Sequence, residues 1–87
     1  MDTNELRAKL IALAVESGDG NFTAQDIADA DGSLRRLNYS SLAYMRLIDA
    51  IENELGVYLD PEADNALFEN IDSLTELVRK GMDAVDA

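Results

Sequence analysis

The chain has 87 residues, 47% of them apolar, which is enough for one domain with a small hydrophobic core. Asp and Glu number 18 against 7 Lys and Arg, and the resulting formal charge of −11 opposes binding to nucleic acid or to an anionic membrane. The chain contains no histidine and no cysteine, which excludes Ser–His–Asp catalysis, disulfide bonds and thiolate metal sites. We therefore expect a single domain over residues 1–87 that is not an enzyme by itself and holds no metal.

The beginning of the chain and its surface charge bear on where the protein works. No charged-then-apolar leader follows Met1, and the apolar stretches are much shorter than a membrane span. We therefore expect a cytoplasmic monomer. Its acidic surface should attract basic surfaces of other proteins in fast, salt-sensitive encounters. A second interpretation is that the charge only keeps a small domain soluble.

The first predicted helix covers residues 3–16. Asp2 followed by Glu5 resembles a capping box at its start. The sequence SGDGN at 17–21 ends it, because Gly, Asp and Asn favour turns. The apolar residues at helical spacing, which should form its buried face, are Leu6, Leu10, Leu13 and Ala14.

A long connection leads from this helix to about Asn38. It contains one predicted short helix over 24–30, with Thr23 as its cap, and the turn sequence DADGS at 29–33. Long connections inside a compact domain are often functional.

Both turns of this connection imitate EF-hand calcium loops, but the ligand positions do not fit. In the first register, positions one and twelve fall on Val15 and Asp26, where an oxygen ligand and a glutamate are needed. In the second register they fall on Ile27 and Asn38. We therefore do not expect a calcium site.

The strongest helical pattern covers residues 41–55, and Gly56 ends it. Residues 57–59 are expected to be extended or to form a loop. The apolar stripe of the helix, with the spacing required for burial, consists of Tyr44, Leu47, Ile48, Ile51 and Leu55.

Two further helices complete the chain. A short one is predicted from Asp60, because Pro61 fits the first helical position, and its core anchors are Leu67 and Phe68. The last helix is predicted over 73–82. No strand pattern is present, so the sequence predicts an all-α fold: a small four-helix bundle of three main helices plus a short one, with a long first loop. The apolar residues expected to be buried by the last helix are Leu74, Leu77, Val78 and Met82.

Serines stand at two of the predicted helix starts. Ser73 is explained by its own helix, because Glu76 lies three residues on in the reciprocal capping pattern, and Asp72 is an alternative cap. At the other start, Ser40 can cap the helix, and a capping pair with Ser41 is the simplest interpretation. Both starts offer free N–H groups and a helix dipole that favour a phosphate, so this property does not separate them.

The outer face of the 41–55 helix does separate the two serines. On this face, apolar side chains lie beside carboxylates within one or a few turns of Ser41. An apolar patch rimmed by charge indicates a docking surface for a partner. Asn53 lies on the same face. The residues expected to make the docking contacts are Leu42, Met45, Arg46, Asp49 and Glu52.

The stretch LNYSSLAYMRLIDAIENELGVYLDPEADNALFENIDSLTELV, residues 37–78, resembles the acyl and peptidyl carrier protein family. Members of that family have a Leu, a variable pair and then Asp-Ser-Leu at the start of a helix that ends before Gly. A short extended loop, a short helix and a closing helix follow. The first helix and the long first loop of this chain fit as well, so the resemblance implies a carrier-protein-like bundle over most of the chain. The positions in register are Leu37, Ser41, Leu42, Leu47, Ile48, Ile51, Leu55 and Gly56.

The resemblance assigns the modified serine to Ser41, although the IDSL sequence at Ser73 is closer to the family's tripeptide. It implies that a phosphopantetheinyl transferase attaches 4′-phosphopantetheine from coenzyme A to Ser41. The thiol at the end of this arm would carry acyl or aminoacyl groups as thioesters. Enzymes of a fatty-acid, polyketide or nonribosomal-peptide type of pathway would load and process them, docking weakly through basic patches.

Departures from the family pattern leave alternatives open. Ser40 stands where the family has an aspartate that is thought to help the transferase engage, so the efficiency of priming or the choice of transferase is open. Tyr39 replaces a residue that is usually small. An arginine at the position of Arg46 is common in peptidyl carriers, whereas glutamates at the positions of Glu52 and Glu54 are typical of acyl carriers. The cargo class is therefore also open. The alternative function is an unmodified acidic helical interaction module without cofactor.

Two groups of residues near this helix have roles that the sequence leaves open. Arg35 and Arg36, just before it, would contact the phosphate or simply be solvated, and solvation is the simpler expectation. The core candidates that would part to admit an acyl chain are Tyr44, Leu47, Ile51, Phe68 and Leu77.

Overall fold

A computed structural model describes residues 2–60 and 68–86, the side chains of 84–86 excepted. The helices in this part of the chain are α1 (Thr3–Ser17), α2 (Ala24–Asp29), α3 (Ser41–Leu55) and α5 (Ile71–Asp86). Three of them are long, and α2 has only 6 residues. The predicted all-α bundle of three main helices plus a short one is therefore confirmed. The isolated bridge between Ser33 and Asn70 is the only strand-like pairing among these residues.

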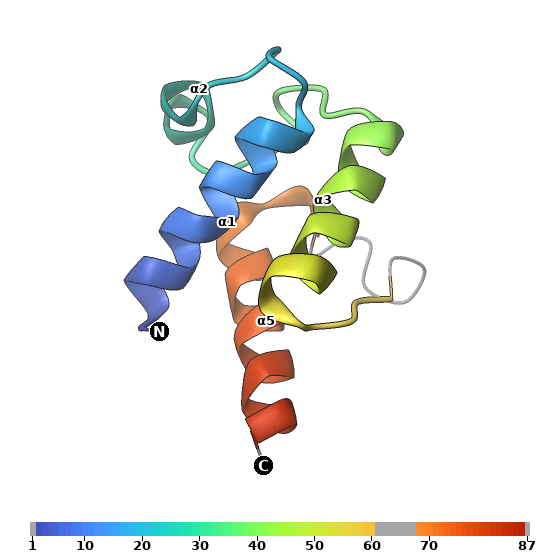
Figure 1. Cartoon of the computed structure of the whole chain (residues 1–87). Coiled ribbons are helices and arrows are strands. Elements are labelled where there is room, and N and C mark those ends of the chain that lie inside the picture. The colour runs from blue at the N-terminus through green and yellow to red at the C-terminus, as the bar shows by residue number, and fades with distance from the viewer. Residues whose placement is uncertain (1, 61–67, 87) are drawn as a thin grey trace.

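Helix α1 occupies the centre of the bundle. It packs against both α3 and α5, while α2 lies beside the end of α1 from which the long first loop departs (Figure 1). The buried core residues come from all four helices and from the loops: Leu6, Leu10, Leu13, Ala14, Ile27, Ala30, Leu34, Tyr39, Ala43, Leu47, Ile51, Val57, Phe68, Ile71, Leu74 and Val78. No described helix has the length and apolar content that a membrane-spanning helix needs.

Local sequence signals explain where most helices begin and end. The Asp2 carboxylate accepts the N–H of Glu5 at 2.8 Å, and Thr23 forms a full capping box with Asp26. Gly56 ends α3 with φ 70°, in the left-handed region that glycine adopts without a steric penalty. Residues 57–59 are irregular, as expected.

The predicted cap of the last helix was wrong. Helix α5 begins at Ile71, two residues before the predicted start near Ser73, and neither Ser73 nor Asp72 caps it. The cap is the side chain of Asn70, whose Oδ1 accepts the N–H of Asp72 at 2.8 Å. Asn is as good a cap as Ser, and complete burial of Ile71 fixes the helix start two residues earlier. The helix also continues to Asp86, beyond the predicted end at Met82.

The predicted apolar stripe of α3 is only partly right. Leu47 and Ile51 are fully buried, whereas Tyr44, Ile48 and Leu55 are half-buried at the border of the core. In α5, Leu77 and Met82 are likewise only partly buried. Ala43, which lay outside the predicted stripe, is buried as well. The short helix predicted to follow Asp60, with its anchor Leu67, lies outside the described residues, whereas its second predicted anchor, Phe68, is described and is buried as expected.

Candidate functional site at the start of α3

The segment before α3 is held against α1 by a buried tyrosine. The hydroxyl of Tyr39 donates a hydrogen bond of 2.7 Å to the carbonyl oxygen of Ala14, near the end of α1. Its ring packs against the rings of Phe22 and Tyr44, with centroids 5.5 Å and 4.8 Å away. Burial raises the pKa of Tyr39 to about 12, so its hydroxyl remains a hydrogen-bond donor at neutral pH. Tyr39 thus has a structural role: it anchors the segment before α3 to α1.

The two serines at the start of α3, Ser40 and Ser41, have different environments. Ser40 is the N-cap, and its Oγ accepts the N–H of Ala43 at 3.1 Å. Ser41 is the first helical residue and is exposed. Because Ser40 caps the helix, the hydroxyl of Ser41 is not needed for capping. The prediction that Ser40 can cap the helix is confirmed, and Ser41 does not share in the cap.

The helix start is also a suitable environment for an anion. The N–H groups of Ser41 and Leu42 have no acceptor within the helix, and no acidic residue lies in the first turn. A phosphate on Ser41 would meet these donors and the positive end of the helix dipole, an interaction of about 0.3–1 kcal/mol at an exposed site.

The side chains predicted to make docking contacts share one exposed side of α3. Leu42 and Met45 are 58% and 66% exposed, so two large apolar side chains three residues apart lie on the same surface. Arg46 and Asp49 are exposed as well, and Glu52 is half-buried. Arg46 lies 4.0 Å from the carboxylate of Asp19 in the loop after α1, so its charge is directed toward that loop.

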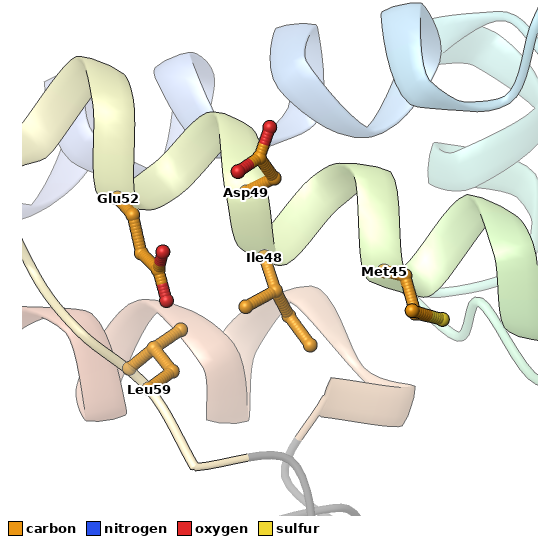
Figure 2. A pocket seen from close by; sticks show the side chains of 5 residues that line it. All are labelled: Met45, Ile48, Asp49, Glu52 and Leu59. Atoms are coloured by element: carbon orange, nitrogen blue, oxygen red, sulfur yellow. The ribbon is translucent and has the colours of Figure 1, made fainter.

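A groove of about 400 Å³ continues from this exposed side toward the loop after α3. We call it the α3 groove; its lining residues are Met45, Ile48, Asp49, Glu52 and Leu59. Figure 2 shows Met45, Ile48 and Leu59 on one side of α3, with the Glu52 carboxylate extended toward Leu59, whereas the Asp49 carboxylate points away from Ile48 and Leu59. The sequence placed Ile48 in the core and gave Leu59 no role, because a groove between a helix and a loop has no periodic signal.

The arginines before α3 are exposed and form ion pairs. Arg35 lies 3.8 Å from Glu69, and Arg36 lies 3.6 Å from Asp31. Tyr44 is close to the first of these pairs, and its pKa is raised by burial and by the Glu69 carboxylate, with Arg35 opposing the shift. Neither arginine is directed to a phosphate position by these contacts, so they neutralise nearby carboxylates.

The second serine occupies a different environment. Ser73 lies within the first turn of α5, two residues after the helix start, and is half-buried. The residues around it are fixed by the bridge of residue 70 to Ser33 and by the ion pair of Asp72 with Arg7 at 2.8 Å. In the described residues, no three acidic side chains come together as ligands of a metal ion would.

Comparisons with protein-family models, with curated proteins and with solved structures gave no match.

Proposed function

We propose that this chain is a carrier protein that is modified on Ser41 with 4′-phosphopantetheine and shuttles thioester-bound intermediates between enzymes. The observation that carries the proposal is the exposed Ser41 side chain on the first residue of α3, next to a serine that already caps the helix. A hydroxyl in this place can receive a long prosthetic group without loss of helix stability. The site of attachment would be surrounded by unpaired backbone N–H groups.

The attachment is a phosphoryl-type transfer for which this chain supplies only the acceptor. The Oγ of Ser41 forms a bond to the phosphorus of the phosphopantetheine unit of coenzyme A. The bond from that phosphorus to the adenosine bisphosphate is broken, and the Oγ proton leaves to a base of the transferase. Since the chain has no histidine and no cysteine, the new terminal thiol would be its only strong nucleophile.

The exposed side of α3 suits the transient partners that a shuttle needs. Leu42 and Met45 provide apolar contacts beside the attachment site, and Asp49 and Glu52 provide negative charge for basic docking patches. Surface charges of this kind raise the rate of encounter more than the lifetime of the complex. Arg46 would contribute a single positive contact. We place this work in a cytoplasmic pathway of fatty-acid, polyketide or nonribosomal-peptide type.

A second candidate function is an acidic interaction module that is never modified. The observation that favours it is Ser40, which stands where carrier proteins have an aspartate and which acts here as a helix cap. The same exposed apolar residues of α3 would then bind a basic protein without a tether.

Priming with coenzyme A tests the proposal directly. The purified chain is incubated with coenzyme A and each of several promiscuous phosphopantetheinyl transferases, and its intact mass is measured. We expect the mass to increase by one phosphopantetheine group, the increase to be lost in Ser41→Ala and kept in Ser73→Ala. A chain that none of the transferases modifies would contradict the carrier function and favour the unmodified module. Modification that persists in Ser41→Ala would contradict the assignment of the site.

A further inference from the structure

The α3 groove lies on the same stripe of the helix as the proposed attachment site. Met45, Ile48 and Glu52 follow Ser41 by four, seven and eleven residues, which places them on one side of an α-helix. With a rise of about 1.5 Å per residue, Met45 lies about 6 Å and Glu52 about 16 Å from Ser41 along the axis. A group attached to Ser41 through a long flexible arm can therefore fold back along α3 into the groove.

The lining of the groove combines an apolar surface with negative charge. Met45, Ile48 and Leu59 form the apolar part, and the Glu52 carboxylate reaches over it toward Leu59 (Figure 2). The groove, about 400 Å³ in volume, is shallow and open to solvent, so it suits a weakly held group and not an enclosed ligand. The groove thus offers contacts for a short hydrocarbon chain and for a positive charge at its end.

No cation of the described residues neutralises the two carboxylates of the groove. The basic residue of α3 itself, Arg46, pairs with Asp19. The lysine that reaches α3 from α1, Lys9, lies 3.4 Å from Glu54. Asp49 accepts a hydrogen bond of 3.3 Å from the neutral side chain of Asn53. The groove therefore retains a net negative charge, which repels an anionic cargo and attracts a cationic one.

We propose that the α3 groove holds the cargo of the prosthetic arm and selects for an acyl group that bears an ammonium group, such as an aminoacyl thioester. The role of the tether rests on the proposed function; the preference of the groove for ammonium does not. A single exposed ion pair is weak, but a tether raises the effective concentration of the cargo to the millimolar range, so a weak site is occupied. Because Met45, Asp49 and Glu52 also belong to the docking surface, a docked partner displaces the cargo from the groove.

Free probes test the preference of the groove on the unmodified chain. Hexylamine, hexanol and hexanoate have the same hydrocarbon chain and differ in charge at its end. Each is titrated into the ¹⁵N-labelled protein, and the backbone amide shifts of Met45, Ile48 and Leu59 are followed. We expect hexylamine to bind about threefold to fivefold more tightly than hexanol and hexanoate to cause no saturable shift. Equal binding of all three probes, or no shift at these residues with any of them, would overturn the inference.

Charge-neutral variants show which carboxylates are responsible. The double variant Asp49→Asn/Glu52→Gln should bind hexylamine and hexanol equally, with most of the effect due to Glu52. The matched control Glu16→Gln/Glu76→Gln makes the same change in net charge at exposed positions outside the groove and should keep the preference. A preference that survives in the first variant, or that is lost in the control, would contradict a specific ammonium site. Unchanged spectra elsewhere in the protein show that each variant is folded.

A tethered probe separates this inference from the proposed function. If Ser41 can be primed, it is loaded in separate samples with an arm that carries an aminohexanoyl group and with one that carries the isosteric heptanoyl group. Only the aminohexanoyl arm should change the backbone amide shifts of Ile48 and Leu59 strongly. Failure of priming together with selective hexylamine binding would refute the carrier function and leave the ammonium site standing. Successful priming without selective binding of hexylamine, or equal shifts from the two arms, would refute the cargo groove alone.

Discussion

The first turns of α3 and α5 both contain a Ser-Leu pair, and the structure holds them in different ways. At α5, the start is tied to the long first loop: the N–H of Ile71 donates to Gly32 at 2.8 Å, and Asn70 caps the helix. The left-handed φ of Gly32, 80°, lets its carbonyl group face α5. At α3, one anchor, Tyr39, lies just before the helix. The residues after it, Ser41 and Leu42, face solvent.

This difference shows that the availability of a side chain depends on its neighbours more than on the local sequence. IDSL is the closer match to the carrier-protein tripeptide, yet its serine lies in a turn whose start is fixed on both sides. The NYSSL sequence is the poorer match, but its first serine caps the helix and its second is exposed. The predictions that follow test this contrast, beginning with the largest expected effect.

The first prediction compares an apolar residue at each helix start. Ile71 is fully buried, so Ile71→Ala should lower the free energy of unfolding by about 2–5 kcal/mol through lost burial and a cavity. Leu42 is 58% exposed, so Leu42→Ala should change it by less than about 0.5 kcal/mol. Urea unfolding followed by circular dichroism measures both values. Similar losses in the two variants would mean that the start of α3 is anchored as firmly as that of α5.

The second prediction separates the two serines of α3. Ser40→Ala removes the cap bond to Ala43 and should cost about 1 kcal/mol of unfolding free energy, within a range of about 0.5–2 kcal/mol. Ser41→Ala removes an exposed hydroxyl that the helix does not use and should cost less than about 0.5 kcal/mol. The same urea experiment applies. If Ser41→Ala proved as costly as Ser40→Ala, the hydroxyl of Ser41 would have a structural role, and the case for a free attachment site would weaken.

The third prediction concerns the anchor of α3. Tyr39→Phe keeps the ring and removes the hydrogen bond to Ala14, and should cost about 1 kcal/mol of unfolding free energy at neutral pH. Because the folded pKa of Tyr39 is raised to about 12 from an ordinary value of 10.0, the folded state holds this proton more tightly than the unfolded state. The contribution is complete below pH 10 and is lost as the pH rises from 10 to about 12.

Unfolding curves across this pH interval give the test of the anchor. The wild type should lose stability more steeply between neutral pH and the alkaline end than Tyr39→Phe does. Tyr58→Phe is the matched control, because Tyr58 is 83% exposed, and it should follow the wild type. A pH dependence that is the same in Tyr39→Phe and the wild type would show that another group, such as Tyr44, is responsible.

Much of the fold follows from local signals that a single sequence contains. The bounds of α3 were predicted to the residue, because a cap at Ser40, an apolar stripe and Gly56 all agree. The cap of α5 was mispredicted, because the sequence contains two signals for a helix start. Asn70 is one, and the Ser73–Glu76 pattern, which fits a capping box, is the other. Only the contacts of Asn70 and Ile71 with the distant loop at 31–33 decide between them.

The candidate site was predictable in part for similar reasons. Helical periodicity suffices to place Leu42, Met45 and Asp49 on the outer side of α3, beside Ser41. The role of Tyr39 was not predictable, because its hydrogen bond reaches Ala14, 25 residues earlier. The α3 groove was missed because Leu59 lies in an irregular segment, whose position relative to α3 depends on the turn at Gly56.

The last prediction has the smallest expected effect on stability and the most direct bearing on the contrast between the two helix starts. Ser40→Asp introduces the carboxylate that precedes the modified serine in carrier proteins. Asp and Ser cap helices about equally well, and a negative charge at a helix start is favourable, so the free energy of unfolding should change by less than about 1 kcal/mol. The rate of phosphopantetheine attachment should nevertheless rise, because only the transferase would sense the new charge. Ser73→Asp adds the same charge in the first turn of α5 and should leave the rate unchanged. Equal rates in Ser40→Asp and the wild type would mean that a transferase can engage α3 without a carboxylate at residue 40.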